Sequence, residues 1–182
     1  MSRLKKQFNS TIAPQIQKQL GYRNVMQVPR VTKITINSGT GRALQDEKFL
    51  DVVERTLTRI SGQKPVRNKA RQSISAFKIR EGMIVGLSVT LRGTRMYDFL
   101  DKLINVALAR VRDFQGIDPK SVDRTGNLSI GFKEHTVFPE IRSDEVETIH
   151  GLEVVITTTA RTHEEGVVLL TALGVPFKKD NA

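Results

Sequence analysis

Apolar residues recur along the chain at two spacings, one typical of helices and the other typical of strands. Near the start, five of them lie four residues apart and predict an amphipathic helix over 3–20. They are Leu4, Phe8, Ile12, Ile16 and Leu20. Gly21 follows as a left-handed cap, and Pro14 within the stripe predicts a kink or a restart of the helix.

Three further helices are predicted from apolar residues at three- and four-residue intervals. One begins at about Asp46, and its buried stripe consists of Phe49, Val53, Leu57 and Ile60. The next is capped by Thr94 and runs to about residue 111. The last covers 167–173 and follows the capping box Thr162-x-x-Glu165.

Alternation of apolar and polar residues predicts strands over 31–37, 85–91, 128–132 and 152–158, and we expect a further strand over 65–69. The resulting order of elements is typical of an α+β fold, with helices packed on one face of a mostly antiparallel sheet. We expect a single domain over 1–182, whose other sheet face is open, polar and basic. Its predicted open-face residues are Lys33, Asn37, Arg67, Lys69, Thr90 and Arg92.

A glycine pair, Gly39 and Gly41, follows the first predicted strand. A dinucleotide-binding fingerprint would need a third glycine where Leu44 stands, and a Walker loop would need Gly-Lys-Ser/Thr. The chain has neither. We therefore interpret 38–41 as a tight turn.

The formal net charge of the whole chain is +10, and the positive charge is concentrated in its first half. Residues 1–45 contain eight bases and no acid, and residues 59–95 contain nine bases and one acid. Residues 96–182 contain ten bases and fourteen acids. A basic half joined to a mildly acidic half favours nucleic acid as a partner on one side only, over a merely soluble basic surface.

The basic stretch 62–100 contains a run in which polar residues recur at every second position: Arg67, Lys69, Arg71, Ser73 and Ser75. On an extended chain they would project to the same side and face a phosphate backbone. Residues 70–82 are predicted to be a loop. Its Phe77 has two open interpretations, a ring folded back onto the core or a ring that stacks on a nucleotide.

The predicted open face lacks the aromatic residues with which an RNA-recognition sheet stacks bases, and the chain has no Trp. It therefore favours contact with the phosphates and 2′-hydroxyls of folded RNA. Asn37, Gln63 and Thr90 would supply neutral hydrogen bonds that fix the register, while Lys and Arg supply affinity.

Other classes of protein find little support in the composition. The chain has no Cys, which excludes disulfide scaffolds, thiolate metal sites and cysteine nucleophiles. It has no apolar run near twenty residues and no signal-peptide core, so we expect a cytoplasmic protein without a membrane partner.

Catalytic and metal chemistry is weakly supported. The three histidines, His135, His150 and His163, have no metal-ligand spacing, no acid pair stands out, and Ser73 and Ser75 have no neighbouring His. We expect no cofactor, no metal and no enzymatic activity. An RNA-modifying enzyme that uses the same basic face and a general RNA chaperone remain as alternatives.

Several long motifs resemble the bacterial-type L-five family of the large ribosomal subunit. They are VPRVTKITIN at 28–37, GQKPVRNKARQSISAFKIR at 62–80, EGM at 81–83, VTLRGTRMYDFLDKLINVAL at 89–108, RVRDFQG at 110–116, KEHTVFPEI at 133–141 and ITTTARTHEEG at 156–166. The resemblance covers nearly the whole chain. It implies a structural protein of the cytoplasmic ribosome with a role in translation.

The resemblance also implies partners and sites. Proteins of this family bind 5S rRNA and help to attach it to the large-subunit rRNA in the central protuberance, beside neighbouring proteins. The resemblance implies that the open face, including Asn37, Gln63 and Thr90, meets the 5S rRNA. Together with the cations predicted on that face, the expected 5S rRNA-binding residues are Lys33, Asn37, Gln63, Arg67, Lys69, Thr90 and Arg92. A loop implied to face the P-site tRNA contains Arg71, Ser73, Phe77, Lys78 and Arg80.

A separate surface is implied to bridge to a small-subunit head protein of the S-thirteen family. Its residues are Arg110, Arg112, Asp113, Phe114, Glu134, His135 and Glu140. The chain departs from the usual family pattern at Ala76, Ile84, Ala109 and Gln115. These departures concern the shape of the tRNA-facing loop and of the turn that faces the bridge.

Overall fold

The computed structural model describes residues 2–41, 47–142 and 148–178. Its strands are β1 (Val31–Gly39), β2 (Val66–Lys69), β3 (Ile84–Leu91), β4 (Leu128–Phe132) and β5 (Leu152–Thr158). Its α-helices are α1 (Arg3–Gln7), α2 (Ala13–Leu20), α3 (Glu47–Ser61), α4 (Gly93–Lys102) and α5 (His163–Ala172). All predicted strands and helices are present, with shifts of a few residues at their ends.

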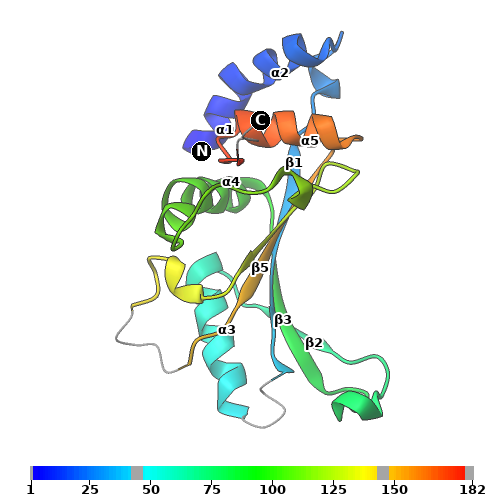
Figure 1. Ribbon diagram of the computed structural model, residues 1–182, viewed down its shortest axis with the longest axis vertical. Coiled ribbons are helices and arrows are strands. Elements are labelled where there is room, and N and C mark those ends of the chain that lie inside the picture. The colour runs from blue at the N-terminus through cyan, green and yellow to red at the C-terminus, as the bar shows by residue number, and fades with distance from the viewer. Residues whose placement is uncertain (1, 42–46, 143–147, 179–182) are drawn as a thin grey trace. The chain divides into compact units, whose positions relative to one another are not determined.

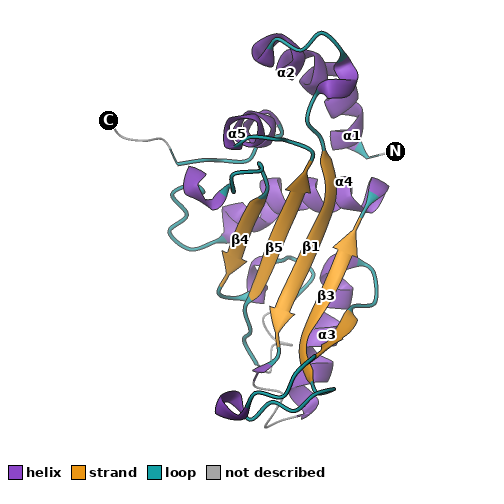
Figure 2. Cartoon of the chain, turned by 90° about the vertical axis from the view of Figure 1, so that its right-hand side faces the viewer, coloured by secondary structure: helices purple, strands orange, loops and turns teal. Residues whose placement is uncertain are grey.

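The strands form one five-stranded sheet in the order β2-β3-β1-β5-β4 (Figure 2). β2 and β3 are consecutive in sequence and pair antiparallel. Alternation along β3 is reflected in burial, since Leu87, Val89 and Leu91 are buried while Thr90 is exposed. The α+β fold class is confirmed.

Two compact units share these strands. Unit 1 comprises Met1–Ile34, Leu91–Ile130 and Val155–Ala182, and unit 2 comprises Thr35–Thr90 and Gly131–Val154. In unit 1, α1 packs on α4 and α2 packs on α5. In unit 2, α3 lies along one side of the strands and leaves the other side uncovered (Figure 1).

The first helix is interrupted, as Pro14 predicted. A π-helical turn, Phe8–Ile12, separates α1 from α2, and Pro14 lies in the first turn of α2. The chain stays helical through this turn and Pro14, although proline has no N–H to donate to the preceding turn. Gly21 ends the helix in the left-handed conformation, with φ of 69°.

Helix α4 begins two residues earlier than predicted and changes its winding. Arg92 is the cap and Gly93 the first residue of α4, so Thr94 lies inside the helix and does not cap it. After Lys102, the chain continues as a π-helical turn, Leu103–Ala107, and a 3-10 turn, Leu108–Arg110. The apolar stripe predicted for this helix is nevertheless largely buried.

The turn predicted at 38–41 is partly wrong, because β1 continues through Gly39. Ser38 and Thr40 are buried, and Ser38 Oγ donates a hydrogen bond to Gly151 O at 2.8 Å. Leu44, and the predicted helix start at about Asp46, lie outside the described residues. Downstream, the stripe of α3 is buried as predicted, and Gly62 follows with φ of 70°.

The capping box of α5 is present in a modified form, and the helix begins at His163, four residues before the predicted start. Thr162 Oγ1 accepts a hydrogen bond from Glu165 N at 3.3 Å. Glu165 Oε2 accepts from Arg161 N, one residue before the cap, and Oε1 accepts from Tyr22 OH at 2.6 Å. The bond from Tyr22 is the main reason that the pKa of Glu165 lies below its usual value.

None of the helices in the described ranges combines the length and apolar character needed to span a membrane.

Candidate nucleic-acid interface

The pairing of β2 with β3 decides which side chains of unit 2 share a face. Arg67 lies opposite Leu87, and Val66 lies opposite Ser88. Directly opposed residues in an antiparallel pair project from the same side of the sheet. Leu87 is fully buried, so Arg67 projects toward the side covered by α3, while Val66 and Asn68 project toward the uncovered side.

We call the uncovered side the open face; it consists of Asn37, Val66, Asn68, Gly86, Ser88 and Thr90. The other side, the covered face, consists of Ile36, Ser38, Arg67, Leu87 and Val89. The open face of unit 2 is therefore neutral and largely polar, with the exposed Val66 on its edge strand, where the sequence predicted it to be basic.

Two amides and a glycine form the middle of the open face. Asn68 Nδ2 lies 3.1 Å from Ser88 Oγ, and Asn68 Oδ1 lies 3.3 Å from the same hydroxyl. A Cβ atom added to Gly86 would lie 3.2 Å from Ser38 O and 4.0 Å from Asn37 Oδ1. Gly86 is buried, and its lack of a side chain lets Ser38 O and the amide of Asn37 lie close to it.

Gln63 lies at the margin of the same face. Its Nε2 donates a hydrogen bond to Thr90 O at 2.8 Å, and its backbone N donates to Ser61 Oγ at 3.2 Å. The amide is therefore held in a defined orientation next to the exposed hydroxyl of Thr90. The predicted grouping of Asn37, Gln63 and Thr90 agrees with these positions.

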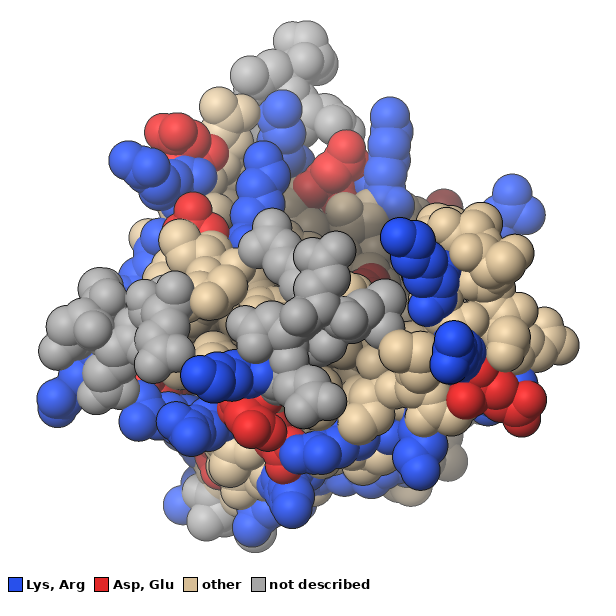
Figure 3. Space-filling view, turned by 90° about the horizontal axis from the view of Figure 1, so that it is seen from below, with Lys and Arg blue, Asp and Glu red and all other residues tan. Residues whose placement is uncertain are grey.

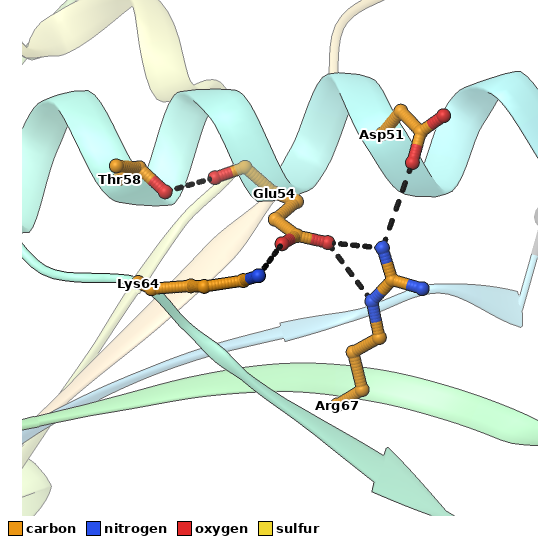
Figure 4. A network of polar contacts seen from close by, with 5 residues as sticks. All are labelled: Asp51, Glu54, Thr58, Lys64 and Arg67. Atoms are coloured by element: carbon orange, nitrogen blue, oxygen red, sulfur yellow. Dashed lines mark hydrogen bonds and ion pairs between the residues drawn. The ribbon is translucent and has the colours of Figure 1, made fainter.

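The predicted place of Arg67 on the open face is wrong. Its Nε donates to Glu54 Oε2 at 2.9 Å, and its Nη2 lies 3.7 Å from Asp51 Oδ1, both on α3 (Figure 4). Lys64 Nζ approaches Glu54 Oε1 at 3.9 Å. The every-second-residue pattern was right about periodicity, but only the pairing with β3 shows which set of residues faces α3.

The same pattern does not continue into the loop. A register shift lies between Asn68 and Lys69, and β2 ends there. Lys69 is exposed. The side of the sheet on which Arg67 lies therefore does not predict the direction in which Arg71, Ser73 and Ser75 project.

The loop between β2 and β3 closes on itself and presents charged and apolar groups to solvent. Ile74 and Ile79 pair through two backbone hydrogen bonds, and Ser73 Oγ accepts from Glu81 N at 2.9 Å. Phe77 is 68% exposed, which excludes the interpretation of a ring folded back onto the core. Figure 3, which views this end of the molecule, shows Lys and Arg side chains projecting into solvent with acids among them.

The remaining predicted tRNA-facing residues, Arg71, Lys78 and Arg80, are exposed on the same loop. Lys78 has φ of 54°, a left-handed conformation that turns the chain back after Phe77. Two of the predicted rRNA-binding residues, Lys33 and Arg92, belong to unit 1, whereas the other five belong to unit 2.

The predicted bridge residues divide between the units. Arg110, Arg112 and Asp113 are exposed in unit 1, and Phe114 beside them is half-buried. This turn is tightly constrained, because Asp113 has φ of 52° and Gly116 has φ of 101°. A Cβ on Gly116 would lie 2.7 Å from Lys178 N.

In unit 2, Glu134 is exposed and Glu140 is half-buried, but His135 is 2% exposed. The prediction that His135 faces a partner is therefore wrong for this structure. Its ring stacks on that of His150, with centroids 4.1 Å apart and planes inclined by 8°. The His150 ring also meets Phe49 of α3 edge-on, so the pair lies on the covered face.

Burial sets the protonation of the histidine pair. Burial, and then the neighbouring His135, lower the pKa of His150 to about 4, and burial also lowers the pKa of His135. His150 Nδ1 lies 3.4 Å from Ser38 Oγ and 3.3 Å from Gly151 O. Both rings are therefore neutral near pH 7 and act as packed polar groups.

Asn68 and Ser88 are open-face residues that the sequence interpretation missed. The available signal was the alternation itself, since Ser88 is in phase with Thr90, and the opposite phase of β2 would have selected Asn68. Within the described ranges, no group of three or more His, Asp or Glu side chains could hold a metal ion.

Comparison with known proteins covers both halves of the chain. Residues 24–80 match the model of the family Ribosomal protein L5, and residues 84–177 match the model of the C-terminus of the same ribosomal family. Large ribosomal subunit protein uL5 of Desulfatibacillum aliphaticivorans is 51% identical, over 98% of this chain and 100% of the relative. The uL5 protein of Herpetosiphon aurantiacus is 53% identical, over 98% of this chain and 99% of the relative.

A third relative, uL5 of Colwellia psychrerythraea, is 50% identical over 98% of this chain and 99% of its own length. These matches confirm the resemblance found in the sequence, and with it the expectation of a non-enzymatic protein of the cytoplasmic ribosome. The chain belongs to the uL5 family of large ribosomal subunit proteins.

Proposed function

We propose that this structural constituent of the large ribosomal subunit binds 5S rRNA through the open face of unit 2 and helps to attach it in the central protuberance. The observation that carries the proposal is the neutral row Asn37, Asn68 and Ser88, uncovered by any helix of unit 2 and flattened at Gly86. Amide and hydroxyl groups can both donate to and accept from 2′-hydroxyls and base edges.

The absence of a side chain at Gly86 favours a close approach of RNA. Gly86 is itself buried, and because it has no side chain, nothing on it stands between an RNA and its polar neighbours Asn37 and Ser88. Gln63, held by Thr90 O, extends the row toward the margin. The register on RNA would come from these neutral groups and the affinity from nearby cations.

Lys69 is the proposed phosphate contact of β2 for the open face, since Arg67 projects toward the opposite side of the sheet. Lys33 and Arg92 in unit 1 stay sequence-based predictions of phosphate contacts. The large-subunit rRNA and neighbouring proteins of the protuberance are the remaining proposed partners on this side.

The loop after β2 is proposed to contact the P-site tRNA. Arg71, Lys78 and Arg80 are exposed on it, and the 68% exposed ring of Phe77 stands among them. A cationic loop with an exposed ring suits a folded RNA, because the ring can stack while the cations meet phosphates.

The intersubunit bridge to a small-subunit head protein of the S-thirteen family is proposed for two surfaces. The first is the turn Arg110, Arg112, Asp113 and Phe114 of unit 1, and the second contains Glu134 and Glu140 of unit 2. His135 supports the second surface from within, through its stacking on His150.

A competition gel shift tests the 5S rRNA proposal. Labelled 5S rRNA is challenged at about physiological salt with excess tRNA and unrelated duplex RNA. Asn37→Ala and Thr90→Ala should each weaken specific binding by about 1 kcal/mol. Lys69→Ala should instead reduce the salt dependence by about one unit.

Equal displacement of 5S rRNA by any RNA would contradict specific binding and would favour a general RNA chaperone. Retention of 5S rRNA with parental affinity in both open-face variants would place the binding surface elsewhere.

A further inference from the structure

A groove on the covered side of unit 2 is separate from the open face. It lies between α3 and the start of β2 and has a volume of about 500 Å³. We call it the α3 groove; it is lined by Asp51, Glu54, Arg55, Thr58, Arg59, Lys64 and Arg67. None of these residues is apolar, so the groove is unsuited to an apolar ligand or to a hydrophobic protein contact.

Cations exceed acids in this groove by four to two. The side chain of Glu54 is only 15% exposed, and it pairs with both Lys64 and Arg67. The side chains of those two cations are 84% and 45% exposed. The acid thus lies below the surface and holds cations that remain accessible to a ligand.

Glu54 orients Arg67 in a way that suits a phosphate. The Nε and Nη2 atoms both donate to Glu54 Oε2, which fixes the plane of the guanidinium (Figure 4). A fixed guanidinium is a favourable phosphate contact, because less conformational entropy is lost when the ligand binds. Arg55 on α3 and Lys64 before β2 are exposed on the same groove, and Thr58 between them offers a hydroxyl.

We propose that the α3 groove binds the sugar-phosphate backbone of a second RNA segment, distinct from the one bound by the open face. Arg67 projects from the opposite side of β2 to Asn68, toward Asp51 and Glu54 of the groove. Unit 2 would then be held between two RNA segments. This inference does not depend on the open face binding 5S rRNA.

Site-directed cleavage tests the proposal in assembled large subunits. The natural chain has no Cys, so a single Thr58→Cys can carry an iron chelate that generates hydroxyl radicals at the groove. Thr58 is exposed, and its hydroxyl bonds only within α3, to Glu54 O at 2.7 Å. Thr90→Cys reports on the open face, and Ser10→Cys on an exposed site of unit 1.

We expect cleavage from position 58 at ribosomal RNA nucleotides that differ from those cut from position 90. No RNA cleavage from position 58, or cleavage only of the nucleotides cut from position 90, would overturn the proposal. If position 90 failed to cut 5S rRNA while position 58 cut another segment, the open-face proposal would fail and the groove proposal would stand.

A binding measurement gives an independent readout. The free protein is titrated with a labelled RNA duplex of unrelated sequence at several salt concentrations. Arg55→Ala/Lys64→Ala should lower the affinity at least about tenfold at low salt and reduce the salt slope by about two. The matched control Lys18→Ala/Lys120→Ala removes two exposed cations from unit 1 and should have a smaller effect.

Equal losses in the groove variant and in the control would show only general attraction to a basic protein and would overturn the proposal.

Discussion

The two faces of the same short strands in unit 2 use polar residues in opposite ways. On the open face, Asn68 and Ser88 interact with each other and carry no charge. On the covered face, Arg67 is committed to carboxylates of α3, and Ser38 is committed to the loop that carries His150. A charged group that pairs with α3 lies on one face, and a neutral pair of side chains lies on the other.

The difference follows from the cost of burial. Glu54, whose side chain is only 15% exposed, is paired with Arg67 and Lys64, because an unpaired charge withdrawn from water is far more costly than an unpaired amide in contact with water. Arg67 has therefore become part of the packing between α3 and β2. The neutral open face keeps hydrogen-bonding groups that need no such pairing, and these give register and selectivity on RNA more than affinity.

The largest expected effect comes from filling the open face at Gly86. In Gly86→Val, the Cβ would meet Ser38 O at 3.2 Å and the methyl groups would cover the backbone beside Asn37. We expect the affinity for 5S rRNA to fall by about 100-fold, or ~3 kcal/mol, in a gel shift.

Gly131→Val is the matched control, because Gly131 is also a strand glycine of unit 2 and has nothing within 4 Å of its added Cβ. Binding by Gly86→Val at the parental level, or an equal loss in Gly131→Val, would contradict the special role of the open face.

The covered face should show a pH dependence that the open face lacks. The pKa of folded His150 is lowered to about 4, whereas an unfolded histidine titrates near 6.5. The contribution of His150 to the free energy of unfolding is therefore fully present above pH 6.5. It is lost as the pH falls toward 4, because in this range the unfolded chain binds a proton and the folded chain does not. Between about pH 7.5 and pH 5 we expect a loss of ~2 kcal/mol, measured by urea unfolding.

His150→Phe should remove most of this pH dependence, because Phe keeps a ring against His135 and Phe49 without a titrating group. His163→Gln in unit 1 is the control. An unchanged pH profile in His150→Phe would show that the buried pair does not set acid stability.

A smaller effect is expected at Asn68, the open-face residue that only the structure identified. Asn68→Ala should weaken 5S rRNA binding by about 1 kcal/mol and leave the free energy of unfolding nearly unchanged. Its side chain contacts the hydroxyl of Ser88, and in the variant water can hydrogen-bond to that hydroxyl instead. The control is Asn9→Ala, at an exposed position of unit 1. A loss of stability without a loss of 5S rRNA binding would show that Asn68 stabilises the fold and does not contact the RNA.

The smallest effect is expected at the rim of the covered face. Glu54→Gln removes the carboxylate that Arg67 and Lys64 share and should destabilise the protein by ~0.5 kcal/mol at low salt, less at high salt. Urea unfolding at two salt concentrations measures this, with the exposed Glu153→Gln as control. Destabilisation that does not depend on salt would mean that packing, not charge, links α3 to β2.

Much of this protein followed from local patterns in its sequence. The stripe of α3, the alternation of β3 and the glycine that ends α2 were predictable, because each depends on the side-chain period of one element or on one backbone conformation. The family could also be recognised from the sequence, because its motifs are long and span both halves of the chain.

The tertiary structure alone decided how neighbouring elements combine. Arg67 was assigned to the wrong face because a period of two gives two equivalent sets of residues, and only the pairing with Leu87 selects one. Likewise, fifteen positions separate His135 from His150, and no local period links them. Their stacking arises where the chain returns to Ser38, because buried polar groups must find partners from whichever segment packs nearby.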